Sequence, residues 1–245
     1  MHCILKSTCV TAPEIEEGPY YVNNELVRQD LVEDQKGVLL RLDIGVIDTA
    51  SCESVPDALV EIWSANATGF YGAFEANTLG GPTMSSNATW LRGGFPTDDS
   101  GTVELTTIYP GFYSGRTIHV HLMVHTDWEQ SSNGTLISHA GSLKHIGQLF
   151  FDESWNDQVL SLEPYTENRG RRTLNSQDHD FARANVDGSS AIVELELLAD
   201  SIEKGLLGFI TIGIDLSADY SIHSGNYYNS TTDLDAPFQN ADVSI

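Results

Sequence analysis

The chain has 245 residues, 40% of them hydrophobic, and its 12 Lys and Arg face 35 Asp and Glu for a formal net charge of −23. That charge argues against nucleic acid and anionic membranes as partners, because both are polyanions. No apolar run is long enough to span a bilayer, and the length provides ample core for a soluble β domain.

Short runs with a period of two residues recur along the chain, whereas helical periodicity is scarce. The predicted strands are 38–48, 58–63, 102–108, 118–125, 191–198 and 208–216. Each run is short and bounded by Gly, Pro, Ser or Asp, which is typical of an all-β sandwich or barrel.

The segments between and after these strands complete the prediction. A short helix is predicted at 152–160, a long polar loop at 162–190, and a surface tail at about 217–245. We therefore expect a single-domain, all-β sandwich over residues 1–245, with long connecting loops, few short helices and an N-terminal segment of residues 1–12.

The cysteines and glycosylation sequons bear on the cellular compartment of the protein. The four sequons are at Asn66, Asn87, Asn133 and Asn229. Cys3, Cys9 and Cys52 include no CxxC pair, so zinc binding is disfavoured and one disulfide with an odd cysteine is the preferred interpretation. A Cys9–Cys52 disulfide would stabilise the fold by roughly 4 kcal/mol in the chain-entropy model. Three free thiols remain the alternative, and the role of Cys3 is open.

We expect a secreted glycoprotein, although "MHCILKST" has too short an apolar patch for a usual signal peptide. The expectation of secretion therefore rests on the sequons and the cysteine count.

The stretch "YPGFYSGRTIHVHLMVH", residues 109–125, contains the strongest functional signal. Side chains alternate along a strand, so His119, His121 and His125 share one face of the predicted strand 118–125. Two imidazoles at i and i+2 are a recurrent way to offer two nitrogens to one metal, although a plain polar face is the other interpretation.

The other candidate donors near this strand are phenols, at Tyr71, Tyr109 and Tyr113. A phenol has an ordinary pKa of about 10, so only a strong Lewis acid holds it as phenolate at neutral pH. Tyrosine and histidine together favour Fe(III) over Zn(II), if they bind a metal at all.

Four motifs, in this order, resemble those of the intradiol ring-cleavage dioxygenases, particularly the secreted, fungal-type branch. They are "PEIEEGPYY" (13–21), "DALVEIWSANATGFY" (57–71), "LRGGFPTDDSGTVELTTIYPGFYSGRTIHVHLMVH" (91–125) and "HIGQLFFDE" (145–153). The resemblance implies a mononuclear non-haem Fe(III), with Tyr71 and His119 as equatorial ligands and Tyr113 and His121 as axial ligands.

The resemblance also implies a reaction and its participants. Catechol-type rings would be cleaved with O₂ to cis,cis-muconate-type diacids, with Tyr113 as a releasable ligand that accepts a substrate proton. Arg116 and Gln148 match the family's active-site arginine and glutamine. The segment of Tyr20 runs near the pocket mouth in the family, so Tyr20 would line the pocket, and packing at the edge of the sandwich is the other interpretation. His125 matches no ligand.

Two further expectations concern assembly and the competing class of function. About a dozen residues precede "PEIEEGPYY", whereas bacterial members carry a long helical dimerisation segment, so we expect a monomer. A secreted transthyretin-like or carbohydrate-binding β-sandwich without catalysis would explain the strands, sequons and acidity, but not the tyrosines and histidines around PGxYxGR. The substrate stays open among catechol, hydroxyquinol, protocatechuate and larger plant polyphenols.

Overall fold

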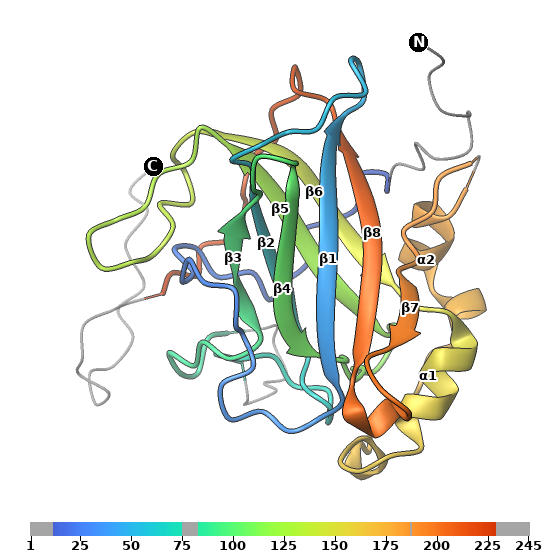
Figure 1. Cartoon of the computed structure of the whole chain (residues 1–245). Coiled ribbons are helices and arrows are strands. Elements are labelled where there is room, and N and C mark those ends of the chain that lie inside the picture. Colours follow the sequence, from blue (N-terminus) through green and yellow to red (C-terminus); the bar gives the residue numbers. More distant parts are fainter. Residues whose placement is uncertain (1–11, 75–82, 187, 229–245) are drawn as a thin grey trace.

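Two four-stranded sheets form a sandwich in the computed structural model, which describes residues 12–74, 83–186 and 188–228 (Figure 1). The first sheet has the order β4 (Thr102–Ile108), β1 (Leu39–Asp48), β8 (Leu206–Ile214), β7 (Glu194–Leu197). The second sheet has the order β3 (Arg92–Pro96), β2 (Leu59–Ser64), β5 (His119–Thr126), β6 (Ser142–Phe150). Strand β1 pairs in parallel with β8, and the other pairings are antiparallel. The predicted all-β sandwich is confirmed.

One hydrophobic cluster joins the two sheets and uses the alternation seen in the sequence. Its members include Leu40, Leu42, Ile44 and Val46 of β1, and Val120, Leu122 and Val124 of β5. All seven side chains are fully buried, and each such burial contributes roughly 1.5–3 kcal/mol to folding. The core therefore fixes β5 with its odd-numbered residues on the opposite face.

That opposite face of β5 is buried as well. The only residue of β5 that is not buried is Thr126 at its end. The N-terminal segment covers the face: a Cβ at Gly18 would lie 2.6 Å from Cε1 of His121, and the Tyr21 ring lies 4.9 Å from the Trp63 ring, between centroids. His119 and His121 consequently lie in a covered layer and not on a solvated sheet surface.

The helices are short and lie beside the β7 edge of the first sheet (Figure 1). Helix α1 (Glu153–Leu160) confirms the helix predicted at 152–160. The loop predicted at 162–190 is wrong in part, because it contains α2 (His179–Ala184) and the 3-10 helices Tyr165–Glu167 and Asn175–Gln177. A further 3-10 helix, Ile202–Lys204, precedes β8.

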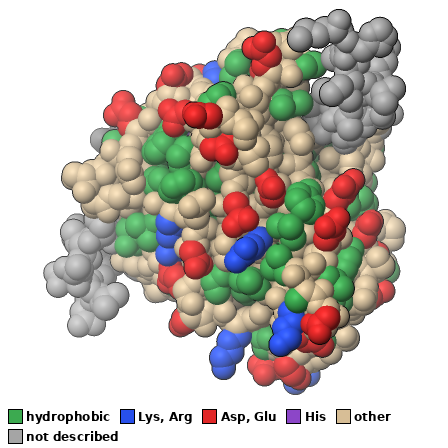
Figure 2. Space-filling model, viewed as in Figure 1, with side chains coloured by type: hydrophobic (Ala, Val, Ile, Leu, Met, Phe, Trp, Pro, Cys, Tyr) green, Lys and Arg blue, Asp and Glu red, His purple; other side chains and the backbone are tan. Residues whose placement is uncertain are grey.

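The described part of the predicted tail lies on the surface and pairs with the N-terminal segment. The amide of Asn23 donates to Asn226 O at 2.8 Å, and the amide of Tyr228 donates to Asn23 O at 2.9 Å. Asp and Glu side chains are spread over the face seen in Figure 2 and outnumber Lys and Arg there. Within the described ranges, no helix has the length and apolar character needed to cross a membrane.

Candidate metal centre and active site

The four predicted metal ligands come together on the covered face of the second sheet. The phenol oxygen of Tyr71 lies 3.3 Å from Nε2 of His119, which lies 3.2 Å from Nε2 of His121. The ring of Tyr113 lies 5.6 Å from the His119 ring and 5.7 Å from the Tyr71 ring, between centroids. Three separate segments supply them: the loop after β2, the loop before β5, and β5 itself.

Sheet register explains the position of His121. It pairs across strands with Trp63 of β2 and Gln148 of β6, and Trp63 pairs in turn with Arg92 of β3. Side chains that are directly opposite one another on neighbouring strands share a face. Arg92, Trp63, His121 and Gln148 therefore form one row across the sheet.

The two imidazoles are neutral and their Nε2 atoms face each other. Nδ1 of His119 lies 2.7 Å from the carbonyl oxygen of Thr117. Only a protonated Nδ1 can donate to that oxygen, which leaves the Nε2 lone pair of His119 directed at Tyr71 and His121. Burial, and next the charge of Arg116, lowers the pKa of His119 to about 3. Burial, followed by His119, also places the pKa of His121 well below its ordinary value.

The surroundings of Tyr71 and Tyr113 keep both phenols protonated, so a cation is needed before they ionise. Burial raises the pKa of Tyr71 well above 10, Tyr113 adds to the rise, and Arg116 opposes it. Burial also raises the pKa of Tyr113, again against the charge of Arg116. A strong Lewis acid between these oxygens and the His119 nitrogen would reverse this balance.

This donor set fits a metal ion. Two donors bound to one ion at about 2.1 Å lie roughly 3 Å apart when the bond angle is near 90°, and the two distances around His119 Nε2 are 3.2 and 3.3 Å. Neutral imidazole is also the metal-binding form. Across the described residues, no group of three or more His, Cys, Asp and Glu side chains is arranged to hold a metal. The phenols are thus essential to any such centre at this position.

Arg116 and Gln148 lie together, as the resemblance implies. Nη2 of Arg116 donates to Oε1 of Gln148 at 2.6 Å. Two carboxylates also hold the guanidinium: Asp178 accepts from Nε at 2.8 Å, and Asp180 lies 3.0 Å from Nη2. Sequence reasoning missed both aspartates because it took 162–190 for a loop. The available signal was Asp178, whose side chain caps α2 by accepting from the amides of Asp180 and Phe181.

Tyr20 completes an aromatic cluster around the donors. Its ring stacks on Tyr71 with centroids 4.4 Å apart and an interplanar angle of 11°. It also meets Tyr113 edge-on at 5.5 Å and Phe74 at 5.3 Å. The predicted pocket-lining residue therefore lies against both phenols.

The remaining Tyr and His candidates belong elsewhere. The Tyr109 hydroxyl donates to Asn156 Oδ1 at 2.6 Å, and the ring is part of the inter-sheet core. His125 lies 3.2 Å, through Nε2, from Oε2 of Glu61. Neither residue approaches the two phenols.

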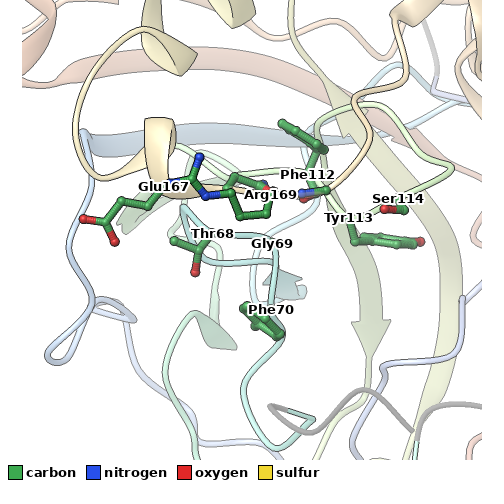
Figure 3. A pocket seen from close by; sticks show the side chains of 10 residues that line it. Thr68, Gly69, Phe70, Phe112, Tyr113, Ser114, Glu167 and Arg169 are labelled. Carbon is green, nitrogen blue, oxygen red and sulfur yellow. Dashed lines mark hydrogen bonds between the residues drawn. The ribbon is translucent and has the colours of Figure 1, made fainter. Parts of the chain in front are cut away.

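A cavity of about 210 Å³ lies beside Tyr113 (Figure 3). Three segments line it: 68–70, 112–114 and 167–170. The last of these belongs to the region predicted as a long polar loop. Tyr113 thus borders this cavity and also contacts the Tyr71 and His119 rings.

Some predicted modification sites can be located. The Asn66 side chain accepts from the amides of Thr68 and Phe70 at 3.1 and 3.0 Å and donates to Gln35 at 3.2 Å. Asn133 is exposed, Asn87 is half-buried, and Cys52 is exposed. Asn229, Cys3 and Cys9 lie outside the described residues, so the Cys9–Cys52 pairing stays a prediction.

Comparisons with known proteins identify the family. The Dioxygenase family model matches residues 12–185. An intradiol ring-cleavage dioxygenase from Tetranychus urticae superposes with a TM-score of 0.73 and 29% identity, covering 90% of this chain and 100% of that one. The mercury-inhibited catechol 1,2-dioxygenase structure from Acinetobacter sp. ADP1 shows the same fold, with a TM-score of 0.53 at 23% identity, over 83% of this chain and 62% of that one.

Curated sequences give a shorter match. Catechol 1,2-dioxygenase from Acinetobacter baylyi is 36% identical over 106 residues, which cover 41% of this chain and 32% of the relative. The matched region spans 42% of the length of a second relative, catechol 1,2-dioxygenase 1 from Acinetobacter lwoffii. The chain thus spans less than half the length of these relatives. Through the match over residues 12–185 and the fold it shares with solved members, the chain belongs to the intradiol ring-cleavage dioxygenase family.

Proposed function

We propose that the protein is a non-haem Fe(III) dioxygenase that cleaves catechol-type rings with O₂ to cis,cis-muconate-type diacids. The observation that carries this proposal is that the Tyr71 oxygen and His121 Nε2 both lie within 3.3 Å of His119 Nε2, beside Tyr113. Two phenol oxygens and two neutral imidazoles suit a hard trivalent ion. When bound, Fe(III) would supply a Lewis acid that draws electron density from a coordinated diol and opens its ring to O₂.

Tyr113 is the residue that we propose accepts a substrate proton. Its side chain is partly exposed and adjoins the cavity of about 210 Å³, whereas Tyr71 is 2% exposed. A ligand that leaves during turnover needs room, and Tyr113 has that room. Its phenol oxygen would then hold the proton that the diol loses.

Arg116 would stabilise negative charge that develops on the ring and oxygen. Its guanidinium is oriented by Asp178 and Gln148, so little reorganisation is needed when charge builds up. Gln148 in turn donates through Nε2 to the Glu16 carbonyl at 3.3 Å, which fixes its own orientation. Arg116 therefore serves the reacting ring, and Gln148 positions Arg116.

The substrate is proposed to be a small aromatic diol taken up together with O₂. Tyr20 would line the substrate position, because its ring contacts both Tyr71 and Tyr113 and shields them from water. A monomer is the proposed assembly.

Oxygen uptake across a panel of catechol, hydroxyquinol, protocatechuate and a larger plant polyphenol tests this function. The proposal expects O₂ consumption with at least one of them, one O₂ for each ring lost, and a diacid as the product. Binding of a diol without O₂ consumption, in a protein that contains iron, would support the alternative of a β-sandwich binding module without catalysis. That alternative does not account for the paired phenols.

Secretion, in the manner of the fungal-type branch, is a separate proposal. It is motivated by the four sequons and the cysteine count. Mass spectrometry of protein from its native host should find a Cys9–Cys52 disulfide and glycan on at least one of Asn66, Asn87, Asn133 and Asn229. Free thiols together with bare asparagines would contradict secretion.

A further inference from the structure

Arg92 is a buried cation to which the proposed reaction assigns no role. Its side chain, on β3, is 2% exposed and lies in the row that contains Trp63 and His121. A buried charge is costly unless it is paired and hydrogen-bonded. Its partners therefore indicate why a cation is retained there.

Those partners belong to two segments that carry site residues. Nη1 donates to the carbonyl oxygen of Tyr20 at 3.2 Å and to Oε1 of Glu25 at 2.9 Å. Nη2 donates to the carbonyl oxygen of Gly72 at 2.7 Å. The guanidinium also lies over the Phe74 ring, 5.7 Å from its centroid.

The two carbonyls are close to the stacked phenols. One is that of Tyr20 itself, and the other belongs to Gly72, the residue after Tyr71. Tyr20 and Tyr71 are far apart in sequence, yet their rings stack at 4.4 Å. A planar guanidinium can bind both backbones at once, whereas a lysine ammonium is a single point of charge.

We propose that Arg92 is a positioning residue: it ties the backbone of Tyr20 to that of Gly72, and so holds the Tyr20 ring on Tyr71 and the Tyr71 oxygen near His119. The catalytic consequence rests on the proposed function, in which Tyr71 is an iron ligand. The link between the two backbones does not depend on iron and can be measured in the iron-free protein.

Arg92→Lys tests the proposal, with Arg172→Lys as the control. Arg172 donates to Glu153 and Asp157 of α1. Amide hydrogen exchange is compared at residues 19–23 and 70–74, and at β1 as a reference for global unfolding. We expect Arg92→Lys to raise exchange at least ~10-fold in the first two segments and to leave β1 unchanged, because loss of the link loosens them locally.

The iron-loaded enzyme gives the second measurement. Arg92→Lys should shift the visible tyrosinate band and lower kcat/KM by about 10²-fold, the scale of a misplacement of about 1 Å. Arg172→Lys should change neither. A role in stability alone would lower the melting temperature without moving the band.

Exchange and band both equal to those of the parent would overturn the proposal. If Arg92→Lys fails to fold, the double variant Glu25→Gln/Arg92→Gln removes both buried charges together and leaves no unpaired ion. It should show the same local exchange, whereas Glu25→Gln alone should not; equal exchange in these two variants would also overturn the proposal. If the parent holds no iron and consumes no O₂, the proposed function fails, but the exchange data still decide the role of Arg92.

Discussion

The indole of Trp63 stacks parallel to the imidazole of His121, with ring centroids 4.9 Å apart and an interplanar angle of 6°. Gly18 packs closely against the same imidazole: a Cβ at this residue would lie 2.6 Å from Cε1 of His121. Nδ1 of His121 has no hydrogen-bond partner among the described residues. Contact with Trp63 and Gly18 therefore orients this ring, whereas metal-ligating histidines usually rely on a hydrogen bond from their second nitrogen.

Tyr113→Phe should slow turnover while iron stays bound. The change removes the phenol oxygen that would bind the ion and accept the substrate proton, and Tyr71, His119 and His121 remain. We expect kcat to fall by roughly 10²–10⁴-fold, as for a lost general acid–base group. Iron content and steady-state O₂ uptake provide the measurement.

The matched control for this variant is Tyr109→Phe. It removes the same hydroxyl from a core residue, where the loss of the hydrogen bond leaves the buried Asn156 Oδ1 unpaired and costs about 1–3 kcal/mol of stability. Iron content and kcat should stay at parent values. A parent rate in Tyr113→Phe, or a loss of rate in Tyr109→Phe, would contradict the assignment of the ligand.

Arg116→Ala should leave iron and colour intact and lower the rate. Its guanidinium hydrogen bonds to Gln148 and Asp178, and its charge would serve the reacting ring. Loss of one such preorganised donor costs about 10²–10³-fold in kcat. Arg172→Ala, which breaks ion pairs with Glu153 and Asp157, is the control and should leave kcat unchanged. Iron loss in Arg116→Ala would mean that the arginine supports the metal and not the ring.

The stability of the protein should depend on pH through Glu25. Burial raises the pKa of Glu25 from 4.5 to about 7, with Arg92 opposing the rise and Glu61 adding to it. A carboxyl whose folded pKa is raised stabilises the fold fully below its unfolded pKa, and loses that contribution as pH rises through the folded pKa. At about 1.36 kcal/mol per pH unit, the loss is about 3 kcal/mol between roughly pH 4.5 and 7.

Denaturant unfolding of Glu25→Gln at pH 4.5, 6 and 8 measures this contribution. The amide of the variant does not titrate. As pH rises from 4.5 to 8, the unfolding free energy of the variant should therefore increase relative to that of the parent by about 3 kcal/mol. Parallel curves for Glu25→Gln would exclude a titration of Glu25 in this range.

The strands that sequence reasoning found are those with one face in the inter-sheet core. The alternation Leu40, Leu42, Ile44, Val46 gave β1 directly, since its other face is more exposed. Strand β6 was not predicted, because its apolar residues Leu143, Ile146 and Leu149 are three positions apart and show no period of two. Strand β3 was missed too, because Gly93 and Gly94 carry no side chain to alternate.

The site residues likewise fall into two groups: those that a local sequence pattern reveals, and those that depend on contacts between distant parts of the chain. Strand geometry alone predicts that His119 and His121 share one face. The order of the motifs identified Tyr71, Tyr113 and Arg116. Long-range contacts supplied the rest: Asp178 meets Arg116 across 62 positions, and Arg92 meets Tyr20 across 72. No local pattern encodes such pairs.

Metal analysis and visible absorption of the purified protein test the central claim most directly. If Tyr71, Tyr113, His119 and His121 hold Fe(III), the protein should contain one iron per chain and be burgundy red through tyrosinate-to-iron charge transfer. Tyr71→Phe should weaken that band, because it removes one of the two phenolates. A colourless protein that carries zinc or copper at full occupancy would contradict the account.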